Sequence, residues 1–383
     1  MSTASDVDAS PSSVPTMHEI AERAGVGKAT VSLALRDDPR LRPETRRRIQ
    51  KLASKMGYRT NATVANLMAQ LRASRTPKYQ ATLGLLNVSS DPKTLTGLCT
   101  FREWAKGCQE RAVQLGYGLD PFWLYEPGIS PARLAKILES RNIRGLVIAA
   151  LLDRAGLPGE FDIIWERFAC VVVGVRPSWP TLNFSSNDQF STALHAVRHL
   201  RAYGYRRIGL VLSPEVDAMV ERRFSAGFWA GLEEFDGCER IPSFPFQQSR
   251  EVTFRAWYAQ HRPDAIVCIH DEVKKWIENM GAKIPDEVGI AHLDRHDELP
   301  DWSGMHQNNT LVAAAAVDML VGQLHRNEVG LPEFPKASLI QSTWIDGPTT
   351  ARHPVRGKPA HGGAKTSVSV AADAEKTGPV KRP

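Results

Sequence analysis

Residues 16–36 read TMHEIAERAGVGKATVSLALR, and this stretch decides the fold of the N-terminal part of the chain. Thr16 and Glu19 form a capping box, because each side chain can satisfy an unpaired amide at the start of a helix. This helix is predicted to end near residue 24, where two glycines flank Val26 and break it. A second helix is predicted over residues 28–36, so the stretch encodes two short helices joined by a tight turn.

A third helix is predicted over residues 43–57, because Pro43 suits the first position of a helix and Gly57 suits the position after its last turn. Three helices of this length and order form a helix-turn-helix domain, for which we predict residues 16–60. The apolar side chains expected to form its core are Met17, Ile20, Ala21, Ala24, Val31, Ala34, Leu35, Ile49, Leu52, Ala53 and Met56.

In a helix-turn-helix domain the second helix enters the major groove and reads base edges near its N-terminal end. Residues 16–75 hold thirteen Lys and Arg against five Asp and Glu, a cationic excess that suits a polyanion. A charged surface alone is typical of many solvated proteins, so the prediction of DNA binding depends on the excess and the fold together. The basic residues expected to meet phosphates are Arg46, Arg47, Arg48, Lys51 and Arg59.

The run from His18 to Ser32, continued by Thr45, Arg46 and residues 56–61, resembles the DNA-binding signature of the lac repressor/galactose repressor family. The resemblance implies that Lys28 and Ala29 read bases. It also implies phosphate contacts by Gly27, Thr30, Ser32, Arg36, Thr45 and Tyr58. Gly27 stands where the family often has Ser, and Leu33 where many members have Arg, so the operator cannot be copied from relatives. The DNA-contacting set implied is Thr16, Gly27, Lys28, Ala29, Thr30, Ser32, Leu33, Arg36, Thr45, Tyr58, Asn61 and Leu67.

Residues 61–80 match the hinge of the same family, in which a helix forms on DNA and a leucine from each subunit enters the minor groove. Leu67 occupies the matching position. An apolar wedge of this kind unstacks a base step and bends the duplex. Thr60 replaces the family's usual proline, which leaves the direction of the chain less constrained. The alternative is an ordinary linker helix whose leucines pack on each other.

From residue 81 onward, short apolar segments alternate with amphipathic ones, a pattern typical of parallel sheets covered by helices. So many repeats predict an α/β body of two doubly wound lobes over residues 81–352, with a ligand cleft at the carboxyl ends of the strands. Predicted strands are 82–88, 118–124, 145–150, 170–173, 207–212, 265–269 and 288–293, and predicted helices are 102–115, 131–140, 188–203, 216–235, 272–280 and 311–325.

Several classes of protein are disfavoured by the sequence. It has no GxSxG, Walker, GxGxxG or HExxH motif, so we predict no enzyme, no catalytic residue and no cofactor. The five cysteines are scattered without the spacing of a metal site, and His292 lies in an apolar run that suits a packed side chain. No apolar run spans a membrane, and residues 1–15 do not form a signal peptide, so we expect a cytoplasmic protein with a disordered lead-in.

The body resembles the periplasmic-binding-protein-like sensor domain of the same family, and the resemblance implies a small-molecule effector, by default a sugar. His270 and Asp271 match the family's Asn-Asp pair, while Asp271 could instead be a plain cap of the helix that follows. Asp294 ends a strand that is similar to another of the family's strand ends. Where the family commonly has an effector-binding Arg, this chain has Phe224, and the preceding pair, Arg222 and Arg223, are the alternatives for that role.

Residues 353–383 lack the leucine heptads of the family's tetrameric members and have the composition of a disordered basic tail. We therefore expect a homodimer on a roughly palindromic operator in double-stranded DNA. One alternative is a regulator that responds to a protein partner and has no small-molecule effector. A further alternative is a cytoplasmic binding protein or enzyme with an appended DNA-binding head.

The hinge interpretation predicts the effect of the substitution Leu67→Ala. Loss of the wedge should reduce bending of the bound DNA and weaken specific binding more than non-specific binding, because the bend depends on the apolar side chain. Bend angles are measured by circular-permutation gel assays. Equal angles for the variant and the parent would rule out the wedge.

Overall fold

The structure is a computed structural model that describes residues 17–35, 41–56, 81–151, 156–236, 239–247 and 250–353. Its N-terminal unit consists of α1 (Met17–Ala24), α2 (Lys28–Leu35) and α3 (Pro43–Lys55). These three helices confirm the predicted order and bury one small apolar core, made of Ile20, Ala21, Val31, Ala34, Ile49 and Ala53.

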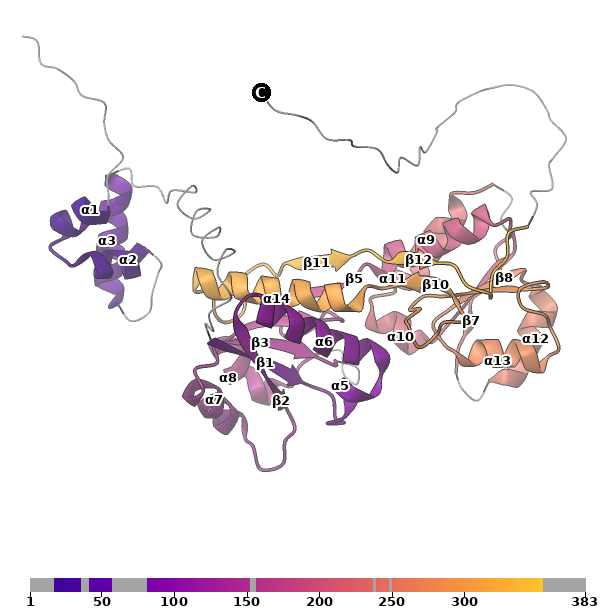
Figure 1. Ribbon diagram of the computed structural model, residues 1–383, viewed down its shortest axis with the longest axis horizontal. Helices are drawn as coiled ribbons and strands as arrows, with labels where there is room; N and C mark the ends of the chain where they lie inside the picture. The colour runs from indigo at the N-terminus through magenta and orange to yellow at the C-terminus, as the bar shows by residue number, and fades with distance from the viewer. Residues whose placement is uncertain are drawn as a thin grey trace, which may run out of the picture.

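The body contains two six-stranded sheets, one in each lobe (Figure 1). The first-lobe sheet is parallel throughout, in the order β11-β5-β4-β3-β1-β2. Helices α6 and α14 cover one face and α7 and α8 the other. The bounds are β1 (Ala81–Asn87), α5 (Thr94–Gly97), α6 (Cys99–Gln114), β2 (Tyr117–Trp123), α7 (Pro131–Ser140), β3 (Gly145–Ala149), α8 (Asp162–Arg167), β4 (Ala169–Val173), β5 (Asn183–Asn187), α14 (Asn309–Arg326) and β11 (Ala337–Ile340).

The second-lobe sheet has the order β12-β10-β9-β8-β6-β7, and only the β10–β12 pair in it is antiparallel among the described strands. Helices α9 and α11 cover one face, and α12 and α13 the other. The bounds are α9 (Gln189–Ala202), β6 (Ile208–Leu212), α10 (Pro214–Met219), α11 (Arg223–Glu233), β7 (Phe244–Pro245), α12 (Glu251–His261), β8 (Ala265–Cys268), α13 (Glu272–Asn279), β9 (Gly289–His292), β10 (Ser303–His306) and β12 (Thr343–Ile345).

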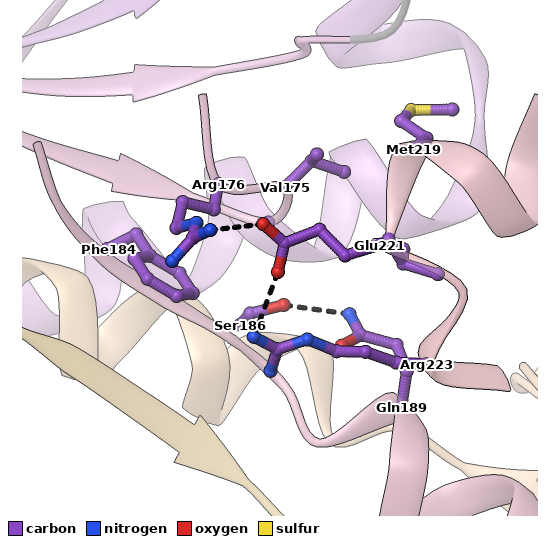
Figure 2. A pocket seen from close by; sticks show the side chains of 10 residues that line it. Val175, Arg176, Phe184, Ser186, Gln189, Met219, Glu221 and Arg223 are labelled. Atoms are coloured by element: carbon purple, nitrogen blue, oxygen red, sulfur yellow. Dashed lines mark hydrogen bonds and ion pairs between the residues drawn. The ribbon is translucent and has the colours of Figure 1, made fainter. Parts of the chain in front are cut away.

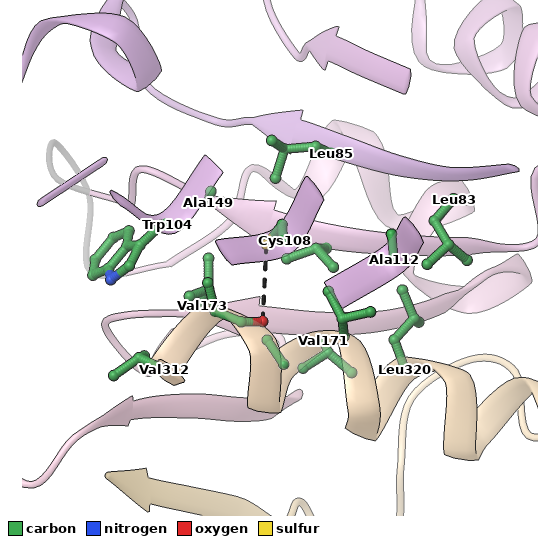
Figure 3. Close-up of a cluster of buried hydrophobic side chains, with 14 of the residues drawn as sticks. Leu83, Leu85, Trp104, Cys108, Ala112, Ala149, Val171, Val173, Val312 and Leu320 are labelled. Carbon is green, nitrogen blue, oxygen red and sulfur yellow. Dashed lines mark hydrogen bonds between the residues drawn. The ribbon is translucent and has the colours of Figure 1, made fainter. Parts of the chain in front are cut away.

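The C-terminal part of the chain returns to the first lobe, where α14 packs along α6 over the sheet (Figure 3). The two helices approach closely at Gly107, because a Cβ there would lie 2.4 Å from the carbonyl oxygen of Thr310. The chain therefore passes between the lobes three times: from β5 to α9, from β10 to α14, and from β11 to β12.

The seven predicted strands are confirmed to within one residue at each end, because buried parallel strands are continuous apolar runs. The predicted helix over 216–235 is wrong as a single element. It is divided into α10 and α11 by a turn in which Glu221 and Arg222 adopt left-handed backbone angles, with φ of 56° and 59°. Such angles are uncommon outside glycine, so the sequence pattern gave no sign of the break.

Candidate functional site

A cleft lies between the two lobes, at the carboxyl ends of their strands. Its cavity has a volume of about 220 Å³. Gly174 and Asn187 line it at the ends of β4 and β5, and Ile269 and Asp294 line it after β8 and β9. A cavity therefore lies where the sequence predicts the ligand cleft, and both lobes contribute residues to its lining.

Most of the wall of this cleft is apolar. Trp104 packs edge-to-face on Phe101, with 5.0 Å between ring centroids, and both line the first-lobe side. Phe224, at the position where the family commonly has an Arg, lines the opposite side and is only 2% exposed. The other apolar lining residues are Leu98, Val175, Val216, Met219, Val220 and Ile269.

The polar side chains that line the cleft have partners within the protein. The hydroxyl of Thr100 donates to the carboxylate of Asp294 across the lobes, at 2.8 Å. The amide of Gln307 donates to the carbonyl of Leu293 at 2.9 Å, and the amide of Gln189 donates to the hydroxyl of Ser186 at 2.8 Å. The bond between Thr100 and Asp294 joins the lobes, and a ligand must compete with protein partners to bind any of these groups.

A charged rim adjoins the apolar cleft, in a second pocket that shares part of its lining (Figure 2). Arg176 from the first lobe forms an ion pair with Glu221 from the second. Arg223 donates to the other oxygen of the same carboxylate, at 3.1 Å. Two guanidinium groups therefore share one carboxylate, which leaves a positive excess at this end of the cleft.

The structure separates the two arginines that the sequence offered as alternatives. Arg223 lines the charged rim. Arg222, held in the left-handed turn, is exposed and lines a different pocket beside Trp229 and Phe244 in the second lobe. Phe224 points into the cleft between the lobes. Arg222 is set apart because it lies in the turn before α11, whereas Arg223 and Phe224 belong to α11 and line adjoining pockets.

His270 and Asp271 do not line either pocket of the cleft, although the preceding residue Ile269 does. The His270 ring stacks on Phe246 with 3.7 Å between centroids, and its Nε2 accepts a hydrogen bond from the amide of Ser213 at 3.1 Å. Burial lowers the pKa of His270 to about 4. A role in effector binding for this pair therefore remains a prediction.

Asp271 occupies the cap position of α13, but within this described helix its side chain makes no capping hydrogen bond. Its carboxylate lies 3.2 Å from Nε2 of His292, and this neighbour is the main reason that the pKa of Asp271 falls below its usual range. His292 is 3% exposed and its Nδ1 accepts from the amide of Asp294. The alternative of a plain cap is wrong, and His292 is a packed residue as predicted.

Asp294 is the one predicted effector residue that lines the apolar cleft itself. It is 9% exposed, and its second carboxylate oxygen accepts from the amide of Asn309 at 3.3 Å. Asn309 in turn accepts from the indole of Trp104 at 3.2 Å. Asp294 therefore joins the second lobe both to the first lobe and to the start of α14.

The DNA-binding face is described in part. Lys28 and Gly27 are exposed at the N-terminal end of α2, and Thr30, Leu33 and Thr45 are partly exposed. Arg48 donates to the carbonyl of Ala24 at 3.1 Å, so this arginine also ties α3 to α1. Lying outside the described residues are Thr16, Arg36, Tyr58, Arg59, Asn61, Leu67 and the side chains of Ala29 and Ser32.

Two parts of the chain match known protein families. Residues 16–61 match the profile of bacterial regulatory proteins of the lacI family, and residues 197–345 match that of a periplasmic binding protein-like domain. An HTH-type transcriptional regulator of Streptomyces limosus, encoded in the aml 5′ region, is 28% identical over 89% of this chain and 98% of its own length. The HTH-type transcriptional repressor CytR of Escherichia coli K12 is 23% identical over 82% of this chain and 91% of its own length.

Solved structures share the fold. The lac repressor dimer bound to operator and the anti-inducer ONPF superposes with a TM-score of 0.53 at 19% identity, covering 88% of this chain and 100% of the other. The transcriptional regulator CelR in complex with cellobiose gives 0.54 at 19% identity, covering 88% and 99%. None of the described helices is long and apolar enough to cross a membrane.

The buried ring of His270 predicts a pH dependence of stability. Its pKa lies near 4 in the folded chain and near its ordinary value of 6.5 in the unfolded chain. As the pH falls through this window the unfolded chain takes up the proton first, so the free energy of unfolding should decrease, by up to about 3 kcal/mol from this residue. Urea denaturation at pH 7, 6, 5 and 4 measures the decrease.

The substitution His270→Gln keeps an acceptor for the amide of Ser213 but cannot take up a proton. The variant should lose less stability than the parent between pH 6.5 and 4. If the two proteins lose the same stability over this range, His270 does not stay neutral in the folded state.

Proposed function

The chain belongs to the lacI family of bacterial regulatory proteins, and we propose that it is a dimeric repressor whose affinity for a palindromic operator is set by a small molecule in the cleft between its lobes. Like its relatives, it is a DNA-binding transcriptional regulator, and it is not an enzyme. The proposal includes the predicted DNA-contacting residues. We also propose that the protein is located in the cytoplasm and is associated with the nucleoid when it is bound to DNA.

The observation that carries the proposal is the combination of an exposed recognition helix with a two-lobed body that encloses a cavity. α2 begins at Lys28 with an exposed basic side chain at the end that would meet the base edges. The body has a cavity to which both lobes contribute, as expected of a site whose occupation changes the position of one lobe against the other.

The dimer follows from how a helix-turn-helix domain reads DNA. One α2 covers a few base pairs, and two copies related by a twofold axis are needed to specify an operator of useful length. The lac repressor in the matching structure is a dimer on its operator, and CelR is in complex with cellobiose. We propose the same assembly here and a small-molecule effector, although Phe224 and the apolar wall of the cleft differ from what a sugar requires.

Selection of bound sequences from random DNA by the full chain tests the proposal. We expect an inverted repeat of two half-sites. The variant Lys28→Ala should relax the choice at one base pair in each half-site, at a cost of about 1–3 kcal/mol to binding of the selected operator. Arg23→Ala, which removes a base from the exposed end of α1, is the control for a general loss of charge.

One outcome would count against this function, and another would count against the role of Lys28. If the full chain enriches no sequence, it is not a sequence-specific regulator. If Lys28→Ala selects the same motif as the parent and only binds more weakly, Lys28 contacts phosphate and base choice lies with other residues.

A further inference from the structure

We propose that the effector of this protein is a small carboxylate with an apolar body, held with its carboxylate between Arg176 and Arg223 and its body in the aromatic cleft. The inference rests on the proposed function, because it names the class of ligand for the same cleft. Its basis is the contrast between the two adjoining pockets, one apolar and one cationic.

The two pockets form one continuous site. Six residues line both of them: Gly174, Val175, Ser186, Gln189, Met219 and Val220. The charged rim therefore adjoins the apolar part along these shared residues. An apolar cavity of roughly 150 Å³ is enough to hold benzene, and this one measures about 220 Å³. The apolar part thus has room for one substituted ring or a short branched chain. The charged rim has a volume of only about 10 Å³, so a ligand carboxylate enters it by displacing the side chain of Glu221.

The apolar part is poorly suited to a sugar. A sugar needs several unoccupied donors and acceptors around its hydroxyl groups, because each buried hydroxyl left unpaired costs about 1–3 kcal/mol. Here Thr100, Gln307 and Gln189 already bind protein atoms. Trp104 and Phe224 face the cavity with apolar surface, on which a ring or an aliphatic chain packs favourably.

The charged rim is suited to an anion. Arg176 and Arg223 share the single carboxylate of Glu221, and all three side chains are between 29% and 46% exposed. Two guanidinium groups can each form two parallel hydrogen bonds with a carboxylate, so a ligand carboxylate can take the place of Glu221 between them. The apolar end of the site holds Asp294, which would repel an anion and so orients the carboxylate toward the arginines.

The position of Glu221 connects the ligand to the lobes. Arg176 belongs to the first lobe and Glu221 to the second, so their ion pair bridges the cleft. Glu221 also lies in the left-handed turn, a backbone conformation that costs free energy in a non-glycine residue. A ligand carboxylate that takes the place of Glu221 on Arg176 would release this bridge and replace it with contacts of its own.

Calorimetric titration of the full chain with four probes tests the inference: 3-phenylpropanoate, 3-phenylpropanamide, D-gluconate and D-glucose. 3-Phenylpropanoate has both the apolar body and the carboxylate. The amide has only the apolar body, gluconate has only the carboxylate, and glucose has neither. We expect the Kd of 3-phenylpropanoate to be lower than that of every other probe by at least about tenfold, since loss of a charge-assisted contact costs at least this much.

Three single substitutions test whether the charged rim binds the carboxylate of the ligand. Arg223→Gln should raise the Kd of 3-phenylpropanoate about tenfold, whereas Arg222→Gln, the matched change at the neighbouring arginine in another pocket, should leave it unchanged. Glu221→Gln removes the competing carboxylate and should lower the Kd. A gain of affinity cannot arise from misfolding, so this variant keeps the test valid if Arg223→Gln is poorly folded.

Equal binding of the amide, or tighter binding of glucose or gluconate, would overturn the inference. So would equal effects of Arg222→Gln and Arg223→Gln, or no binding of 3-phenylpropanoate at millimolar concentration. The last result would favour a protein partner as the signal. Binding of the selected operator is measured separately, so failure of the ligand class leaves the proposed DNA-binding function standing.

Discussion

The hydrogen bonds of the Asn187 side-chain amide fix the junction between the two lobes, on which the arrangement of the body depends. Asn187 lies at the end of β5, where the chain first leaves the first lobe, and is 3% exposed. Its nitrogen donates to the carbonyl of Ile340 at 3.1 Å and to the hydroxyl of Ser342 at 2.8 Å, in the third crossing, while its oxygen accepts from Thr192 at 2.8 Å. A buried amide with all of these partners specifies one arrangement of the crossings.

The second crossing is tied to the third in the same way, since the amide of Asn308 donates to the carbonyl of Gln341 at 2.9 Å. The three crossings therefore behave as one junction, about which the lobes can turn while each sheet keeps its own core. Beyond the junction, side-chain contacts such as that of Thr100 with Asp294 join the lobes at the cleft. Such contacts can be exchanged for contacts to a ligand, which is what a sensor of this shape requires.

The sequence predicted much of this fold because its signals are local. Caps, glycines and apolar spacing located α1, α2 and α3, and apolar runs located seven strands. β5 was missed because it reads NFSSN, and its polar side chains are buried only by partners distant in sequence, such as Ser185 on the carbonyl of Val312. The ion pair between Arg176 and Glu221 joins residues 45 positions apart, so no pattern in the sequence could place Arg176 beside Glu221 and Arg223. Asp294 was found because the end of a strand is a local feature.

In the proposed function, the arrangement of the two lobes sets the affinity of the protein for DNA. Cys99 of the first lobe and His296 of the second have donor atoms within 4.8 Å of each other, so His296→Cys places a second thiol across the cleft. The most direct measurement is the Kd for the selected operator before and after a short thiol-reactive cross-linker joins the two residues, with Cys99→Ser in the same background as the control. We expect the Kd to change by at least about fivefold in the cross-linked protein alone. Equal affinity of the fully cross-linked and free forms would contradict this expectation.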